Sequence, residues 1–269
     1  MRLFYFTSTG QFIATTAAPV VKNILSRKAQ FMRFNNPSCC CYLIQKIVAA
    51  KIANQRTLLR RNQKTSLKET LDSMQNYKNK VTTIEDIDII RGYEGNSSKL
   101  FWEAYPSLFK YPNIWSMNGR NRRPPKDEIN SMLSYGYALL MRDFISAIIV
   151  TGLDHLLGFY HITIPGRPAL ALDLMEPYRP VIIDSLVLRL INEKIISKND
   201  FATTQSGVYM KPEAKKKIIY MYEKRMDEMI THPQFGYHLS YRRMIQLEVK
   251  MLSKYITGEI SDYSPLTTR

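Results

Sequence analysis

The sequence predicts a mainly α-helical protein with a short β segment at its N-terminus and one small β-hairpin. Three observations predict this class. Apolar residues recur at helical spacing over most of the 269 residues. Several of these segments begin at residues that typically cap helices. Strand-like patterns occur only at residues 1–16 and 201–210.

The N-terminal strand and its turn follow from aromatic and β-branched residues around Gly10. Eight helices are then expected, at about residues 20–34, 36–61, 66–79, 83–108, 127–152, 168–193, 213–230 and 239–256. Three of them have clear start signals. Asn36 suits an N-cap with Pro37 at the first helical position, and Thr83 and Asp127 suit the starts of two further helices.

The remaining elements follow from helix-breaking residues. Prolines, asparagines and a glycine crowd residues 111–126, which predicts a loop. Pro177 and Pro180 fall inside the helix expected at 168–193 and should bend it. Residues 201–210 are expected to form the small hairpin.

The net charge of +15 is unevenly distributed. The first acidic residue is Glu69, and the preceding residues hold twelve of the 38 Lys and Arg. A long segment without a carboxylate indicates a polyanionic partner, because Lys and Arg facing phosphates gain by releasing counterions. Nucleic acid is the favoured partner, an anionic membrane surface comes next, and a generally basic solvated surface is the alternative.

Several classes are disfavoured. The most apolar stretch, residues 135–153, contains Arg142 and Asp143, so no membrane span is expected. The N-terminus becomes polar at Thr7, too early for a signal peptide, and we expect a cytoplasmic protein without a membrane partner. The three consecutive cysteines, 39–41, point in different directions on a helix, which predicts small half-buried residues near a helix start rather than a metal site or disulfides.

Asp173, Glu176 and Arg179 are spaced three apart and therefore share one helix face. The surrounding segment is otherwise apolar, and carboxylates there cost free energy unless cations or donors satisfy them. The spacing alone leaves two readings open, a metal or catalytic site and a structural ion pair.

His161 and Glu94 are weaker candidates from the residues alone. His161 lies in a loop-like stretch fifteen residues before Glu176, and an isolated histidine is more often structural than a ligand. Glu94 is flanked by Gly92 and Gly95, and glycines inside a helix cost stability unless something must approach the backbone.

Four basic residues decorate the proline-rich loop: Arg120, Arg122, Arg123 and Lys126. They could clamp DNA, because guanidinium groups bind phosphate oxygens in pairs. A solvated surface loop is the alternative.

Five segments, taken in order along the chain, resemble the Cas1 family. They are Lys51 to Arg56, Arg91 to Gly95, Asn118 to Asn130, Gly152 to His161 and Leu172 to Pro180. The chain departs from the family pattern at Ser97 and Ser98, where alanines are common, and at His155, where proline is usual.

The resemblance implies that Glu94, His161 and Glu176 hold one Mn²⁺ or Mg²⁺ ion, with Asp173 close by. It implies an integrase and nuclease of CRISPR adaptation that acts with Cas2 on double-stranded DNA. The 3′-hydroxyl of a prespacer would attack a phosphodiester at the CRISPR repeat by transesterification. The residues expected to contact DNA are Arg56, Arg60, Arg61, Arg120, Arg122, Arg123, Lys126 and Arg179.

The resemblance also implies a division of the chain. Cas1 proteins usually begin with a β-rich domain that helps form a homodimer, and residues 1–18 are expected to be its remnant. Residues 19–260 would form the helical catalytic domain and residues 261–269 a flexible tail. Two alternatives remain, a casposon-type integrase and an inactive DNA-binding homologue.

Overall fold

The computed structural model describes residues 3–7, 12–16, 24–121, 124–233 and 235–268. It confirms the mainly α-helical class. The α-helices are α1 (Ile24–Phe34), α2 (Pro37–Asn62), α3 (Lys68–Val81), α4 (Ile87–Ala104), α5 (Glu128–Thr151), α6 (Ala169–Met175), α7 (Ser185–Asn192), α8 (Pro212–Asp227) and α9 (Tyr241–Thr257). Shorter helical elements are the 3₁₀ turns η1 (Tyr105–Leu108) and η3 (Lys198–Asp200) and the π-helix η2 (Arg179–Asp184).

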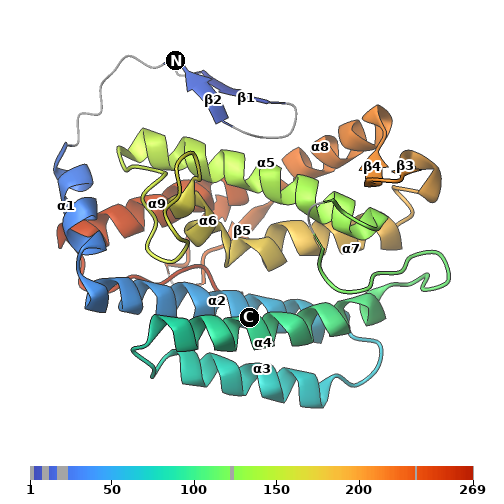
Figure 1. Cartoon of the computed structure of the whole chain (residues 1–269), viewed down its shortest axis with the longest axis horizontal. Helices are drawn as coiled ribbons and strands as arrows, with labels where there is room; N and C mark the ends of the chain where they lie inside the picture. The colour runs from blue at the N-terminus through green and yellow to red at the C-terminus, as the bar shows by residue number, and fades with distance from the viewer. Residues whose placement is uncertain (1–2, 8–11, 17–23, 122–123, 234, 269) are drawn as a thin grey trace.

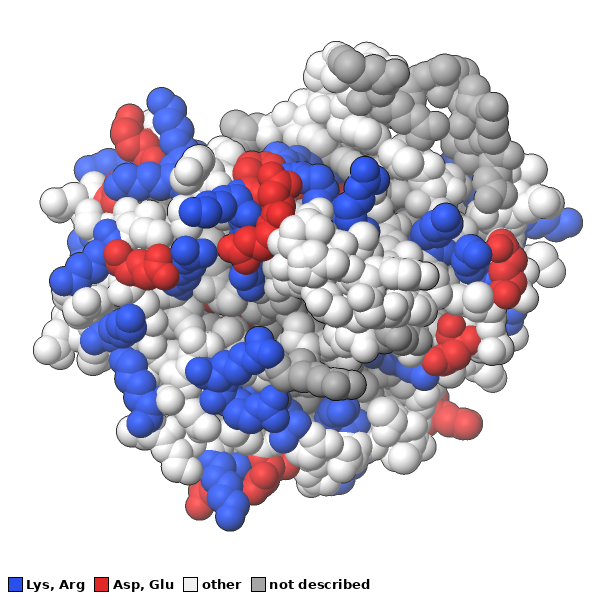
Figure 2. Space-filling view, turned by 180° about the vertical axis from the view of Figure 1, so that it is seen from behind, with Lys and Arg blue, Asp and Glu red and all other residues white. Residues whose placement is uncertain are grey.

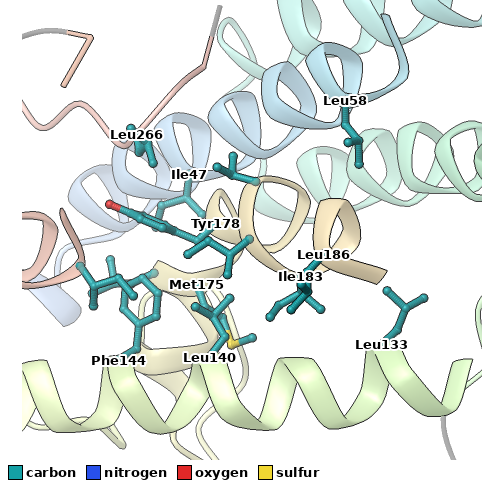
Figure 3. Packing of buried hydrophobic residues seen from close by; sticks show 14 of the residues in the cluster. Ile47, Leu58, Leu133, Leu140, Phe144, Met175, Tyr178, Ile183, Leu186 and Leu266 are labelled. Atoms are coloured by element: carbon teal, nitrogen blue, oxygen red, sulfur yellow. The ribbon is translucent and has the colours of Figure 1, made fainter. Parts of the chain in front are cut away.

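The helices form two layers with the α6–η2 segment between them. Helices α2, α3 and α4 pack together as one layer, and α5 packs with α9 in the other (Figure 1). The π-helix η2 contacts both α2 and α5. Ile47 of α2, Ile183 of η2 and Leu140 of α5 belong to one buried cluster, which Figure 3 shows between the two layers.

Two of the three predicted helix starts are confirmed. Asn36 and Asp127 each accept a hydrogen bond from the backbone N–H three residues later. The third prediction is wrong, because Asp86 rather than Thr83 caps α4. Thr83 instead donates its hydroxyl and its N–H to the carbonyl of Lys80, which completes the end of α3.

The helix predicted at residues 168–193 is not continuous, and the expected bend at its prolines stays a prediction. Helix α6 ends at Met175, and a turn at residues 176–177 separates it from Tyr178 and η2. Pro177 and Pro180 have no N–H, so the regular helical hydrogen bonds are interrupted here. The π-helix that follows has a wider turn, a feature often found at functional sites.

Three antiparallel hairpins complete the described part of the chain. They are β1 (Phe4–Phe6) with β2 (Phe12–Thr15), β3 (Phe201–Thr204) with β4 (Gly207–Met210), and β5 (Met229–Thr231) with β6 (His238–Ser240). The first two confirm predicted strands, although Gly10 lies outside the described residues. The third is a correction: the helix expected to reach Ile230 ends at Asp227, and residues 229–231 form β5 instead.

The prediction of a flexible tail is wrong for residues 262–268, which we call the C-terminal strap. Tyr263 and Leu266 are only 1% and 2% exposed. The hydroxyl of Tyr263 donates to Glu248 on α9, and the N–H of Thr268 donates to Asn54 Oδ1 on α2 at 2.7 Å. The strap has no regular apolar period, so its buried residues left no pattern in the sequence.

Within the described residues, α5 is the one helix that is long and apolar enough to cross a membrane. It packs against α6, η2 and α9, and its Leu133, Leu140 and Phe144 are fully buried. Arg142 and Asp143, near its middle, bond to side chains of α8. These contacts are those of a helix in a protein core.

Candidate metal centre

Two of the predicted acids meet around one ammonium group. Lys51 of α2 forms an ion pair with Glu94 of α4 and another, at 2.8 Å, with Oε2 of Glu176. The Lys51 side chain is only 12% exposed. Burial acts to lower the pKa of Lys51, but the carboxylates of Glu176 and Glu94 raise it above its ordinary value. The ammonium therefore stays charged between two acids that are far apart in the sequence.

His161 reaches the same place from the loop before α6. Its Nδ1 lies 2.7 Å from Asp173 Oδ1, and its Nε2 lies 3.8 Å from Glu176 Oε1. Because Nδ1 of His161 is bonded to Asp173, the ring is held with Nε2 directed towards Glu176.

Asp173 is fully buried and acts as an anchor for this loop. Its two oxygens also accept the backbone N–H groups of residues 159, 160 and 161 at 2.6–3.0 Å. Its acceptor positions are used within the protein. Asp173 therefore orients His161, and Glu176 is the acid of the pair that faces the other charged groups.

Gly158 allows the loop to lie this close to α6. A Cβ atom added at Gly158 would lie 2.7 Å from Asp173 Oδ2 and 2.7 Å from the carbonyl carbon of Ala169. Neither distance leaves room for a side chain, so glycine is required where the loop approaches Asp173.

Glu176 lies at the break after α6 and is held ionised. Burial acts to raise its pKa, but Arg179, Lys51 and His161 together hold the pKa of Glu176 at about 2. Arg179, three residues further along the chain, forms an ion pair with Glu176, with Nη2 3.1 Å from Oε1. Oε2 is buried and lies 2.8 Å from the Lys51 ammonium, which balances its charge.

Arg179 lies over the ring of Tyr137, a partly buried side chain that is bonded to the buried Asp184. Its guanidinium lies 4.7 Å from the ring centre of Tyr137, and that of Arg120 lies 5.4 Å from the same ring. The Tyr137 hydroxyl donates to Asp184 Oδ1 at 2.5 Å. Burial raises the pKa of Asp184 to about 6, despite Tyr137 and the two arginines, which act to lower it.

A cavity of about 640 Å³ opens beside these groups, between α4, α5 and η2. Its lining is mixed in charge and includes Lys51, Glu94, Trp102, Arg120, Arg179 and Asp184. A cavity with both acids and guanidinium groups can receive a metal ion together with an anionic substrate such as a phosphodiester.

The residues fit a divalent cation. Two carboxylates and one imidazole nitrogen form a ligand set that suits Mn²⁺, Mg²⁺ and similar ions. Glu176 Oε2 is a buried carboxylate oxygen that already faces a cation, the Lys51 ammonium at 2.8 Å. Within the described ranges, no three His, Cys, Asp or Glu side chains already stand in a metal-binding arrangement. The Lys51 ammonium lies between Glu94 and Glu176 instead, so ion binding requires this side chain to move aside.

The predicted DNA-binding residues divide into two groups. Arg56 donates to the carbonyl of Leu71, and Arg120 donates to Asn130 and Ser134, so both guanidinium groups tie parts of the protein together. Arg179 belongs to the centre itself.

The other predicted DNA contacts lie on the surface or outside the described chain. Arg60, Arg61 and Lys126 are exposed, and Arg122 and Arg123 lie outside the described residues. Figure 2 shows Lys and Arg spread over one face of the molecule, with Asp and Glu between them. The phosphate contacts proposed from the sequence remain predictions.

Lys51, Tyr137 and Asp184 are site residues that the sequence did not predict. Lys51 stands in a segment that resembles a known family, but nothing in its spacing pointed to Glu94. Tyr137 and Asp184 lie in apolar helical segments, and an acid in such a segment was the available signal, as it was for Asp173.

Comparisons with known sequences agree on one family. The family model described as CRISPR associated protein Cas1 matches residues 1–224. The chain is 37% identical over 270 residues to a CRISPR-associated exonuclease Cas4/endonuclease Cas1 fusion of Geobacter sulfurreducens, covering 97% of this chain and 48% of that protein. It is 35% identical over 270 residues to a CRISPR-associated endonuclease Cas1 of Thermus thermophilus, covering 99% and 79%. The chain thus spans about half the length of the fusion proteins that it matches.

Solved structures share the fold. A Cas1 protein from Thermotoga maritima has a TM-score of 0.81 at 25% identity, covering 100% of this chain and 81% of that one. A casposase bound to its integration product has a TM-score of 0.84 at 24% identity, covering 98% and 73%. A chain of a Cas6-RT-Cas1–Cas2 complex has a TM-score of 0.84 at 23% identity, covering 99% and 29%.

Proposed function

The chain belongs to the Cas1 family, and from this premise we propose that it is a metal-dependent DNA endonuclease and integrase of CRISPR adaptation. The observation that carries the proposal is the meeting of Glu94, His161 and Glu176, which come from α4, a loop and the break after α6. Relatives of this chain are named CRISPR-associated endonucleases, which supports nuclease chemistry.

Glu94, His161 and Glu176 would hold one Mn²⁺ or Mg²⁺ ion, and the imidazole nitrogen favours Mn²⁺. When bound, such an ion would supply positive charge to stabilise the phosphoryl oxygens and the leaving oxygen. Asp173 keeps the His161 ring turned towards Glu176. Arg179 holds Glu176 ionised and, with Arg120, lines the cavity in which a phosphodiester would lie.

The reaction would be a transesterification. The 3′-hydroxyl of a prespacer forms a new phosphodiester with repeat DNA, one phosphodiester of the repeat breaks, and its 3′-oxygen leaves as a hydroxyl. One bond of the same kind forms and one breaks, so no nucleotide energy source is required.

Double-stranded DNA and Cas2 are the proposed partners, and the chain would act as a homodimer in the cytoplasm of a prokaryote. The charge excess before Glu69 supports DNA. Membership of the family supports Cas2, and the fold is shared with a chain from a Cas6-RT-Cas1–Cas2 complex. A casposon-type integrase is less favoured, because the matching family model and the curated relatives are Cas1.

Strand transfer tests the proposal. A labelled short duplex with free 3′-hydroxyls is incubated with supercoiled plasmid carrying a repeat, with and without Cas2, in Mn²⁺ or Mg²⁺. Joining should fall by about 100-fold or more in each of Glu94→Ala, His161→Ala and Glu176→Ala, because a bound ion contributes several kcal/mol to the transition state. Glu69→Ala, at an exposed acid of α3, is the matched control and should join normally.

Two outcomes would contradict the proposal. Joining that survives all three substitutions would remove the metal centre from the chemistry. DNA binding without joining or cleavage by the unaltered chain would favour the alternative of an inactive DNA-binding homologue.

A further inference from the structure

Asn54 is a buried side chain whose hydrogen bonds all lead away from its own helix. It lies on α2 and is 1% exposed. Its Nδ2 donates to the carbonyl of Pro177 at 2.7 Å and to that of Leu266 at 2.9 Å. Its Oδ1 accepts the N–H of Thr268 at 2.7 Å and the hydroxyl of the same residue at 3.1 Å. Both donors and both acceptor positions of the amide are therefore used.

The contact with Pro177 fixes the corner that carries Glu176. Pro177 follows Glu176 directly, at the point where the chain leaves α6. Carbonyl groups at a helix end lack helical partners and need others. Asn54 supplies one from α2, and Lys51, three residues earlier on the same face of α2, holds the Glu176 carboxylate. One face of α2 thus holds both the backbone and the side chain of this corner.

The C-terminal strap holds the same corner from the other side. Glu248 Oε2 of α9 accepts the hydroxyl of Tyr178 at 3.0 Å and the N–H of Leu266 at 3.2 Å. Figure 3 shows Leu266 next to Tyr178 and Ile47, and all three belong to the buried cluster. Pro177 and Tyr178, the two residues after Glu176, are therefore both connected to the strap, one through Asn54 and the other through Glu248.

We propose that Asn54 is a positioning residue for Glu176 and that the C-terminal strap is part of its support. The inference rests on the proposed function, in which Glu176 is a metal ligand. Without the amide of Asn54, the Pro177 carbonyl loses its partner and the strap loses three of its hydrogen bonds. The corner then relaxes, and the Glu176 carboxylate no longer matches the positions of Glu94 and His161. Groups that orient ligands in this way typically change metal affinity by about 10- to 100-fold.

Mn²⁺ affinity of the whole chain, measured from free Mn²⁺ by electron paramagnetic resonance, tests the inference without requiring activity. Asn54→Ala should bind Mn²⁺ at least about 10-fold more weakly than the unaltered chain. The matched control is Asn62→Ala on the same helix, where an exposed amide donates to the carbonyl of Leu58. Asn62→Ala should bind normally. All titrations are made below the melting transition of every variant, so a general loss of stability does not enter the result.

A second variant approaches the corner from the strap. Deleting residues 264–269 removes Leu266 and Thr268 but leaves α2, α4 and α6 unchanged. It should weaken Mn²⁺ binding in the same direction as Asn54→Ala. It also replaces Asn54→Ala as the test if that variant does not fold.

Unaltered Mn²⁺ affinity in a folded Asn54→Ala chain, or in the deletion variant, overturns the inference. Failure of the proposed function has a different signature: either the unaltered chain binds no Mn²⁺, or Glu176→Ala binds it as well as the unaltered chain does. Either of those results refutes the metal centre and the positioning role with it.

Discussion

Lys51 shows how one residue can balance a site that is built for a cation. Its ammonium contacts Glu94 and Glu176, which would otherwise repel each other across a partly buried space. Removing one partner of such a cluster leaves the remaining charges uncompensated, which typically costs about 3–5 kcal/mol when the cluster is fully buried. The cost here is smaller, because Glu94 is 19% exposed.

Lys51→Met should therefore lower the melting temperature of the metal-free chain. It should also increase the rise in melting temperature on adding Mn²⁺, because the ion no longer competes with the ammonium for the two carboxylates. Thermal unfolding with and without Mn²⁺ measures both effects. Lys217→Met is the control: this exposed lysine of α8 is paired with Asp200 rather than with either carboxylate. An equal Mn²⁺ response in Lys51→Met and the unaltered chain would mean that Lys51 does not lie where the ion binds.

At the scale of elements, the important contact is between the loop at residues 158–161 and α6. Asp173 accepts hydrogen bonds from three consecutive N–H groups of this loop and bonds to the His161 ring. Gly158 has no side chain, which lets the loop lie close to α6. The loop and the helix therefore act as one unit that presents His161 and Glu176 together.

Gly158→Ala should disturb this unit. The added methyl would lie 2.7 Å from backbone of Ala169, which cannot move without shifting α6. Overpacking of this kind costs about 1–3 kcal/mol, and Mn²⁺ affinity should fall with it. Urea unfolding and the Mn²⁺ titration measure the two effects. Gly92→Ala in α4, where nothing lies within 4 Å of the added Cβ, should be neutral or slightly stabilising; similar losses in both variants would refute the role of the close approach.

The sequence predicted those features whose causes are local. Asn36 and Asp127 cap helices through bonds that span three residues, and the spacing of Asp173 and Glu176 placed both on one face. The meeting of Glu94 with Glu176 depends on how α2 packs with α4 and η2, which no local pattern contains. Only the family resemblance brought them together.

The missed features are equally instructive. Lys51 and Asn54 bond to partners more than forty residues away in the sequence. Two polar residues three apart on a helix are common on both solvated and buried faces, so their spacing did not mark a site. The strap has no period and only a few apolar residues, so its burial against α2 and α9 had no signal in the sequence. Proline predicted a bend in the helix after Glu176 but could not predict the wider turn of η2.

At the scale of the whole molecule, α9, the α6–η2 segment and the strap are joined at a buried carboxyl group. Glu248 of α9 accepts hydrogen bonds from Tyr178, Tyr263 and Leu266. Burial raises the pKa of Glu248 from 4.5 to about 7, and these three donors only partly offset it. The folded chain therefore holds a proton at pH values where the unfolded chain releases it.

This proton gives a defined pH dependence of stability. Between about pH 4.5 and pH 7 the folded state binds more protons than the unfolded state, so the free energy of unfolding falls as pH rises through this window. The group contributes most below pH 4.5 and has lost that contribution above pH 7. A difference of two to three pKa units corresponds to roughly 3 kcal/mol.

Glu248→Gln should remove this dependence, because glutamine is neutral throughout and its amide can donate to the Tyr263 hydroxyl in place of accepting from it. The stability of the variant relative to the unaltered chain should rise by roughly 3 kcal/mol from pH 4.5 to pH 7.5, as measured by urea unfolding across that range. Asp184, whose pKa is raised to about 6, acts in the same direction but is present in both chains, so the difference isolates Glu248. Glu259→Gln, at an exposed position after α9, should leave the pH profile unchanged. If the difference in free energy of unfolding between Glu248→Gln and the unaltered chain does not change with pH, Glu248 is already ionised in the folded protein. The strap would then be bonded to a carboxylate rather than to a protonated carboxyl group.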